Sequence, residues 1–483
     1  MAAHNPYPRR LAGLIAVVAA MALVSLVGCA NLAPDFERPA LPVPEGFGND
    51  AVAASPLGAT PGLGWSELVQ APQLRSVIAL ALDKNRDLRV ALLSIEKARA
   101  QYDVERANRF PDIAASALGN RSRSAQDLRP NGGAQIGSQY SAQLGFSSYE
   151  IDFFGRVRNL NDVALQEFFR VSENRRSVQL SLIAEVANAW LTLAANQQRL
   201  QLARETLRSR QASYALVERM FGLGASSGLV LAQNQTTVDG ARLDVAAYTS
   251  QVARDRNALN ALVATPVPAN LLPANPVSGQ VSAAYPEVAA LVSMAADMSS
   301  SVLLQRPDVQ AAEHVLRGSY ASMGAARAAF FPSITLTASA GTASNALTGL
   351  FEAGSGSWSF MPQIRLPIFD AGRNQANLQV AQAMRDIAVA QYEKTVQTAF
   401  REVADALADR ATLAQQVSAQ TDLLDATQRA FALSDARFQA GVDDYLTVLD
   451  SQRSLYAAQQ TLISLQLAEQ SNRITLYKVL GGR

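Results

Sequence analysis

The sequence predicts an α+β membrane protein built from two internal repeats, each with a long helical hairpin and a pair of amphipathic strands. Three observations lead to this fold class. Between Gly372 and Gly441 there is no Gly or Pro, so about 65 residues can form one helix about 100 Å long. Two segments of alternating apolar and polar residues precede that run, and the same elements recur earlier in the chain.

The segment 437–453 has the composition of a turn between two helices. Gly441 supplies the positive φ that ends a helix, and Asp443 or Asp444 can cap the next one. Phe438 lies three residues before the glycine, and the chain then stays helical to Leu480. We therefore expect a helical hairpin whose tip lies at this turn.

The same hairpin occurs in the first half of the chain at a constant offset of 217 positions (372 − 155). The matched pairs are Gly155 and Gly372, Glu185 and Glu402, Phe221 and Phe438, Gly224 and Gly441, Leu229 and Leu446, and Gln235 and Gln452. Chance similarity would not keep one offset over about 100 residues, so the pattern indicates a structural repeat. The expected organisation is a first repeat at 65–264, a Pro-rich linker at 265–286 and a second repeat at 287–480.

Residues 1–28 have the pattern of a lipoprotein signal peptide. Arg9 and Arg10 precede an apolar run, and small residues lead to Cys29, the single cysteine of the chain. We expect cleavage before Cys29 and acylation of its thiol; the alternative is an ordinary signal peptide with a chance cysteine. Ala30, rather than an aspartate, follows the cysteine, which by analogy with lipoprotein sorting favours the outer membrane. Prolines make 29–64 an extended, lipid-anchored segment.

Composition excludes several classes of function. The chain has 42 basic and 41 acidic residues, and loss of Arg9 and Arg10 leaves 40 against 41, so nothing indicates nucleic-acid binding. Cleavage leaves His314 as the one histidine, which argues against a catalytic triad or a histidine metal site, and we expect His314 to be structural. No metal site, no cofactor other than the lipid on Cys29, and no enzymatic activity are expected.

Residues 113–120 and 140–152 read as one β-hairpin, and 333–340 and 357–368 as a second. In the second hairpin, Ser and Thr alternate with apolar residues, as in transmembrane strands with one lipid face and one aqueous face. The residues expected on the lipid face are Ile334, Leu336, Trp358, Phe360, Ile364 and Leu366.

Four strands in one chain cannot close a barrel, which needs about eight. An open strand edge in hydrocarbon would leave backbone groups unpaired at several kcal/mol each. We therefore expect the barrel to be shared between chains. The alternative is a soluble four-stranded sheet packed on helices, because Ser/Thr faces also occur on solvated sheets.

The sequence resembles the outer membrane efflux protein family, which comprises the TolC-like lipoprotein channels of tripartite efflux pumps of the resistance-nodulation-division type. The resemblance covers nearly the whole mature chain. The motifs that carry it are 306–309 (RPDV), 325–336 (AARAAFFPSITL), 149–156 (YEIDFFGR), 369–373 (FDAGR), 35–39 (DFERP) and the hairpin tip. It implies a homotrimer with a shared 12-stranded outer-membrane barrel and a long α-helical barrel in the periplasm.

The resemblance also implies a periplasmic gate at Leu446, Asp450 and Arg453. Three symmetry-related leucines can form an apolar plug, and three carboxylates one turn further form an anionic ring. The alternative for Asp450 and Arg453 is a solvated pair on one helix. A tyrosine holds the gate of similar channels near this tip, and Phe438 stands in its place without a hydroxyl.

The expected function is a passive export duct for small molecules such as antibiotics. Its partners would be a periplasmic membrane-fusion adaptor that docks on the tips, an inner-membrane pump that supplies the energy, and outer-membrane lipid. Two other functions are compatible with the sequence: the duct of a type I protein secretion system, and a periplasmic coiled-coil lipoprotein tether that forms no channel. The transported substrates cannot be read from these residues.

Overall fold

The computed structural model describes residues 30–47, 64–123, 125, 136–274 and 298–482. The expected signal peptide and Cys29 lie outside the described residues. The chain divides into two compact units. The first unit contains the described residues up to Ala40, Ile95–Val171 and Ala311–Tyr392, and the second contains Leu41–Ser94, Ser172–Gln310 and the chain after Tyr392.

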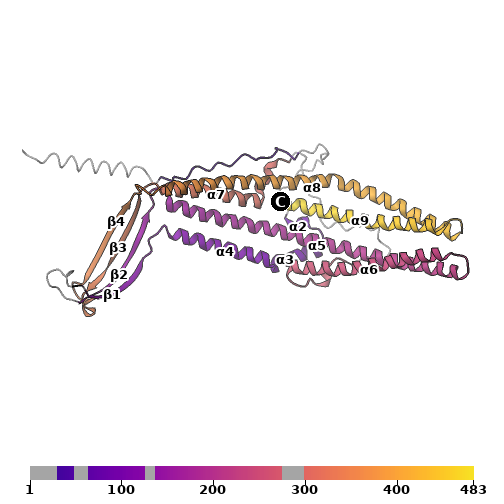
Figure 1. The fold of residues 1–483 in the computed structure, drawn as a ribbon, viewed down its shortest axis with the longest axis horizontal. Coiled ribbons are helices and arrows are strands. Elements are labelled where there is room, and N and C mark those ends of the chain that lie inside the picture. The colour runs from indigo at the N-terminus through magenta and orange to yellow at the C-terminus, as the bar shows by residue number, and fades with distance from the viewer. Residues whose placement is uncertain (1–29, 48–63, 124, 126–135, 275–297, 483) are drawn as a thin grey trace, which may run out of the picture. The chain divides into compact units, whose positions relative to one another are not determined.

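The first unit contains one antiparallel sheet with the strand order β1-β2-β3-β4 (Figure 1). Its strands are β1 (Ala114–Arg123), β2 (Ile136–Ile151), β3 (Ser333–Ser344) and β4 (Gly356–Arg365). Each half of the chain thus contributes one hairpin, and β2 and β3 join the two hairpins. β4 stops at Arg365, short of the expected end at Ile368, because its partner β3 begins opposite Arg365 and the hydrogen-bonded ladder runs out there.

β2 contains a bulge that the sequence analysis did not find. Its register against β3 shifts between Phe146 and Tyr149, and Ser148 has a positive φ of 55°. The extra residue changes the parity of the strand. Tyr149 and Ile151 therefore share a face with Phe146, although their residue numbers are odd and that of Phe146 is even.

Long helices form most of the rest. The helices are α2 (Trp65–Leu68), α3 (Pro72–Lys84), α4 (Arg86–Ala107), α5 (Arg156–Gly222), α6 (Gly228–Val263), α7 (Pro307–Ala328), α8 (Arg373–Gln439) and α9 (Tyr445–Val479), with 3-10 turns at Ala269–Leu271, Ser300–Gln305 and Leu347–Gly349. α5 and α8 are continuous over 67 residues each, the length that the absence of Gly and Pro predicts. α5 includes a window of mean hydropathy 1.3, sufficient by composition for a membrane span, but half of that window is buried within the chain.

The helix bounds reproduce the internal repeat. α5 and α8 begin and end 217 positions apart (373 − 156 and 439 − 222). α4 and α7 both have 22 residues and are 221 positions apart (307 − 86). The offset therefore changes by four between the parts of each repeat that precede and follow its hairpin.

The apolar core of the second unit lies where α5 packs against α3, α6 and α9. It includes fully buried Leu74, Leu191 and Leu259, together with Ile463 and Ile474 of α9. Packing of the two halves on each other is what makes this core, because no single long helix can bury its own apolar stripe.

Equivalent residues hold the two C-terminal helix ends of the repeats. Asn85 Nδ2 donates to the carbonyl of Leu262 near the end of α6, at 2.8 Å. Arg306 Nη1 donates to the carbonyl of Val479 at the end of α9, at 2.9 Å. Asn85 and Arg306 are 221 positions apart, and Leu262 and Val479 are 217 apart, so the RPDV motif serves as a helix cap at the repeat-equivalent site.

Candidate functional site

The tip of the second repeat is closed by backbone hydrogen bonds around Gly441, which has a φ of 73°. The N–H of Gly441 donates to the carbonyl of Phe438, and the N–H of Val442 donates to that of Arg437, both at 2.9 Å. This is the pattern of a helix that ends on a left-handed glycine. A residue with a Cβ would be strained at this φ.

The two aspartates after the turn have different roles. Asp444 is the N-cap of α9 and accepts a hydrogen bond from the N–H of Thr447, at 3.1 Å. Asp443 instead accepts two hydrogen bonds from the guanidinium of Arg437, at 2.7 and 2.8 Å. These bonds lower the pKa of Asp443 below its ordinary value, so the carboxylate stays ionised at neutral pH. An ion pair thus bridges the turn.

Aromatic and aliphatic side chains pack beneath the tip. Phe438 meets Tyr445 edge to face, with ring centroids 5.2 Å apart. Tyr445 is buried in a cluster with Val217 of α5 and with Val448 and Leu449 of α9. Phe438 therefore acts through its ring, and the cluster holds the start of α9 against α5.

Leu446, Asp450 and Arg453 lie on the opposite face of α9. All three are exposed, and 50% of the surface of Leu446 is accessible to solvent. Arg453 Nη1 lies 3.8 Å from Asp450 Oδ1, and both side chains are largely solvated. Within one chain this is a weak solvated pair, and no plug forms around Leu446.

The first repeat has the same turn without the ion pair. Gly224 also has a φ of 73°, and Ser227 caps α6 by accepting from the N–H of Val230 at 3.3 Å. Met220 occupies the position equivalent to Arg437, and Ser226 that equivalent to Asp443. Leu229, the equivalent of Leu446, is exposed as well.

The sheet has one apolar and one polar face. Cross-strand partners on the apolar face are Ile334 with Ile364, Leu336 with Pro362, Ala338 with Phe360, and Ala340 with Trp358. Leu366, expected on the same face, lies beyond the end of β4. The polar face carries Ser333, Thr335, Thr337 and Ser339 of β3.

Two glycines indicate which way the sheet curves. Gly341 of β3 and Gly145 of β2 both belong to the polar face. A Cβ at Gly341 would overlap the carbonyl oxygen of Ala142, and one at Gly145 that of Ala338. Such close approach of neighbouring strands on one side is expected on the inner side of a strongly curved sheet. The polar face is therefore the concave one.

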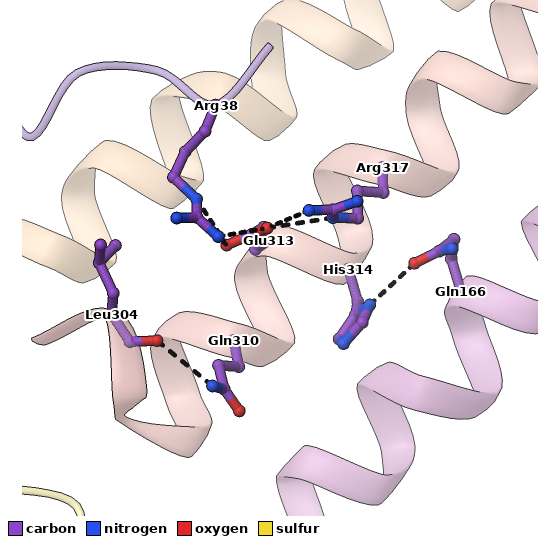
Figure 2. Close-up of polar contacts among 7 residues, drawn as sticks. All are labelled: Arg38, Gln166, Leu304, Gln310, Glu313, His314 and Arg317. Atoms are coloured by element: carbon purple, nitrogen blue, oxygen red, sulfur yellow. Dashed lines mark hydrogen bonds and ion pairs between the residues drawn. The ribbon is translucent and has the colours of Figure 1, made fainter. Parts of the chain in front are cut away.

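The segment that follows Cys29 is held against α7 in the first unit. Arg38 donates two hydrogen bonds to the carboxylate of Glu313, at 3.1 Å each, and Arg317 donates to the same group at 2.7 Å. Figure 2 shows the two guanidiniums approaching Glu313 from opposite sides. Arg317 also lies 4.1 Å from the ring centroid of Phe36, a cation–π contact.

The neighbouring His314 turns away from this cluster. Its Nδ1 lies 2.8 Å from Oε1 of Gln166 (Figure 2). Its ring centroid lies 5.2 Å from that of Phe169. These contacts fit the structural role expected of it. Across the ranges that the structure describes, there is no group of three His, Cys, Asp or Glu side chains able to hold a metal ion.

Sequence reasoning missed the two ion-paired clusters. The pair of Arg437 and Asp443 could have been found, because the residues flank a turn that the sequence shows. The pair of Arg38 and Glu313 could not, because 275 positions separate its members and no pattern links them.

The family model of the outer membrane efflux protein matches residues 77–265 and 298–482. The toluene efflux pump outer membrane protein TtgF of Pseudomonas putida is 45% identical over 467 residues, covering 95% of this chain and 95% of its own. The antibiotic efflux pump outer membrane protein ArpC of Pseudomonas putida is 42% identical over 461 residues, covering 95% and 93%. The open-state structure of the Neisseria gonorrhoeae MtrE outer membrane channel aligns with a TM-score of 0.83 and 38% identity over 94% of this chain and 98% of that one.

Proposed function

Because the chain belongs to the outer membrane efflux protein family and is the outer-membrane channel of an efflux pump, we propose that three copies form a passive duct with a gate at the second-repeat tip. The family, the channel fold, the outer-membrane location and the non-enzymatic role predicted from the sequence are confirmed. The trimer, the gate, the lipid and the partner proteins are the further steps of the proposal.

The open edges of the sheet support ring closure. β1 and β4 each have only one partner within the described chain, so in a bilayer both need a neighbouring copy. The internal repeat also gives a register. Ile151 pairs with Ile334 within the chain. The repeat equivalent of Ile151 is Ile368 (151 + 217), and that of Ile334 is Ile113 (334 − 221). We therefore expect Ile368 of one copy to pair with Ile113 of the next. Ile368 is 86% exposed and Ile113 is 61% exposed in the single chain, as expected of residues that a neighbouring copy would cover.

The gate proposal rests on the exposed face of α9. Leu446, Asp450 and Arg453 project from one side of the helix, while the opposite side is buried against α5. In a three-fold ring with this face inward, Leu446 would supply a plug and Asp450 an anionic ring that favours cations. The ring is three-fold and not six-fold, because the first repeat has Gln233 in place of Asp450.

The partner proposal rests on the exposed tips. Leu223 in the first tip is 85% exposed, and Val442 in the second is 63% exposed. Apolar side chains held out at a helical tip suit the packing of another helical protein, here a periplasmic adaptor that links the channel to an inner-membrane pump. Adaptor contacts made only in the open state would shift the tip toward opening.

The lipid proposal rests on the segment that follows Cys29. The N–H of Ala30 donates to the carbonyl of Phe153, two residues past the end of β2, at 3.1 Å. Ala30 thus lies beside the end of the sheet from which α5 starts. An acyl chain there can enter the inner leaflet of the outer membrane.

The substrate proposal rests on the names of two relatives. TtgF serves a toluene efflux pump and ArpC an antibiotic efflux pump. We extend this to the present chain as export of small, largely apolar organic compounds. A deletion strain should become more sensitive to solvents and antibiotics.

The gate can be tested by conductance. Replacing Leu446 and Asp450 together by alanine should raise the single-channel conductance in planar bilayers and the leak of antibiotics into cells. The matched control replaces Leu229 and Gln233, their repeat equivalents, and should leave conductance unchanged. Equal conductance in the wild type and the Leu446/Asp450 variant would remove these residues as the constriction.

A further inference from the structure

A cavity of about 310 Å³ lies where the strands of the first unit meet its long helices. The ends of β2 and β4, the start of β3 and the first residues of α5 and α8 line it. Three of its lining residues are arginines, namely Arg156, Arg365 and Arg373. Arg156 begins α5, Arg365 ends β4 and Arg373 begins α8, so the three guanidiniums come from three different elements.

The carboxylates near the cavity already have partners. Glu150 accepts from Nε of Arg156 at 2.8 Å, and Asp152 accepts from the N–H of Arg158 at the start of α5, at 2.7 Å. Asp370 accepts from the N–H groups of Gly372 and Asn374, at 3.0 and 2.9 Å, and so caps α8.

Arg365 and Arg373 differ from Arg156. Within the part of the chain that the structure describes, neither forms an ion pair with a carboxylate, although Arg373 is near enough to Asp370 to help lower the pKa of that carboxyl. The cavity lining therefore has three guanidiniums against the two carboxylates of Glu150 and Asp152, an excess of one positive charge.

The internal repeat shows that this excess comes from one missing acid. Arg156 and Arg373 are repeat equivalents, 217 positions apart, and each is the first residue of a 67-residue helix. Glu150 neutralises Arg156, and the residue equivalent to Glu150 is Pro367. The second repeat thus keeps the arginine and lacks its carboxylate.

The cavity opens on the concave, polar side of the sheet. Arg365 pairs with Ser333, and Glu150 pairs with Thr335, both on the polar face. The stacked rings of Phe154 and Phe331, with centroids 4.8 Å apart, form an apolar wall. Such a wall lowers the local dielectric constant and strengthens hydrogen bonds to a charged group.

We propose that Arg365 and Arg373 form a binding site for a phosphate-type oxyanion at the base of the barrel, on the side that faces the transport path. The inference rests on the proposed channel, because that channel makes the concave face the interior. Two guanidiniums match the paired oxygens of a phosphate group. The duct would then have cationic sites at this level and the carboxylates of Asp450 at its tip.

Two measurements test the site on the mature protein purified from outer membranes, with inorganic pyrophosphate as the probe. Isothermal titration calorimetry in detergent measures binding without any need for conduction. Single-channel recording in phosphatidylcholine bilayers measures block of the current, and this neutral lipid excludes anionic headgroups as competitors. Arg365→Gln with Arg373→Gln should weaken binding and block, by about tenfold for each lost charge-assisted bond.

Arg401→Gln is the matched control, because Arg401 is an exposed arginine of α8 outside the cavity. It should leave both readouts unchanged. Arg365→Lys with Arg373→Lys keeps the charge and should retain part of the affinity, provided that the oligomer persists on a native gel.

The outcomes separate the site from the channel. Binding that is lost only in the glutamine variant supports the site, even if no conductance is found and the channel proposal fails. A conducting channel that neither binds nor responds to pyrophosphate overturns the site and leaves the channel standing. Loss of the oligomer in the glutamine variant, with no pyrophosphate binding by the wild type, also overturns it and assigns the arginines to an acidic group of a second copy.

Discussion

Removal of Arg306 should open the end of α9 far more than removal of Asn85 opens the end of α6. The Arg306 side chain is 8% exposed, donates to the Val479 carbonyl at 2.9 Å, and lies 2.6 Å from Asp308 and 2.7 Å from Glu402. The bond from a charged donor contributes about 2 kcal/mol, and two half-exposed ion pairs about 0.5 kcal/mol each. Arg306→Ala should therefore lower the free energy of opening the end of α9 by about 3 kcal/mol. The neutral bond from Asn85 to Leu262 contributes about 1 kcal/mol to the free energy of opening the end of α6.

Hydrogen–deuterium exchange read by mass spectrometry measures this opening in the intact oligomer. Arg306→Ala should speed amide exchange at the end of α9 roughly a hundredfold, and Asn85→Ala should speed exchange at the end of α6 roughly fivefold. Each variant is the control for the other, because the two positions are repeat equivalents. Similar increases at the two ends would refute the account, since charge and burial would then add nothing to the cap.

Four further perturbations, namely three sets of substitutions and a change of pH, test other parts of the structure. Glu313→Gln should release the segment around Arg38 and raise chymotryptic cleavage after Phe36 several-fold. Burial raises the pKa of Glu313, but the hydrogen bonds from Arg38 and Arg317 outweigh it and keep that pKa below its ordinary value. In the wild type the segment should therefore stay bound at neutral pH and come free only when the pH falls below the ordinary pKa of a glutamate, as amide exchange would show. Gly341→Ala should reduce assembly of the heat-stable oligomer, because the new methyl group meets the neighbouring strand. Cysteines at Ile113 and Ile368 together should form a disulfide between copies, visible on a non-reducing gel.

Each of the three sets of substitutions has a result that would contradict it. Unchanged chymotryptic cleavage after Phe36 in the Glu313 variant would show that the ion pair does not hold the segment. Normal assembly of Gly341→Ala, together with loss of assembly of Gly341→Val in the same assay, would show that the sheet tolerates one added methyl group at position 341. A disulfide between cysteines that replace Ile113 and Phe369, but none between cysteines that replace Ile113 and Ile368, would support the ring of copies and shift the strand register between them.

The repeat made the sequence unusually informative about helices. The absence of Gly and Pro between Gly372 and Gly441 predicted a single helix, and α8 runs from Arg373 to Gln439. Gly441 marked the turn because only a left-handed residue ends a helix in this way. Alternation of Ser and Thr with apolar residues predicted β3 and the face of each side chain on it. All of these signals are local in the chain.

The sequence left open which aspartate caps α9, and both Asp443 and Asp444 satisfied the rule. The structure assigns the cap to Asp444, because Arg437 on the other side of the turn takes Asp443. It also places a bulge near Ser148, which alternation alone cannot locate, because one extra residue reverses the parity of the rest of the strand.

The sequence by itself determined the length of the helices, the position of the turns, the duplication and the alternating faces of the strands, because each depends on neighbours within a few residues or on one repeated offset. Only the tertiary structure decided that Arg38 binds Glu313, that Arg306 holds the end of α9, and that Arg365 and Arg373 line one cavity. Such pairings depend on which distant segments pack together. No local periodicity encodes that choice, because it is the burial of shared apolar surface that brings the segments into contact.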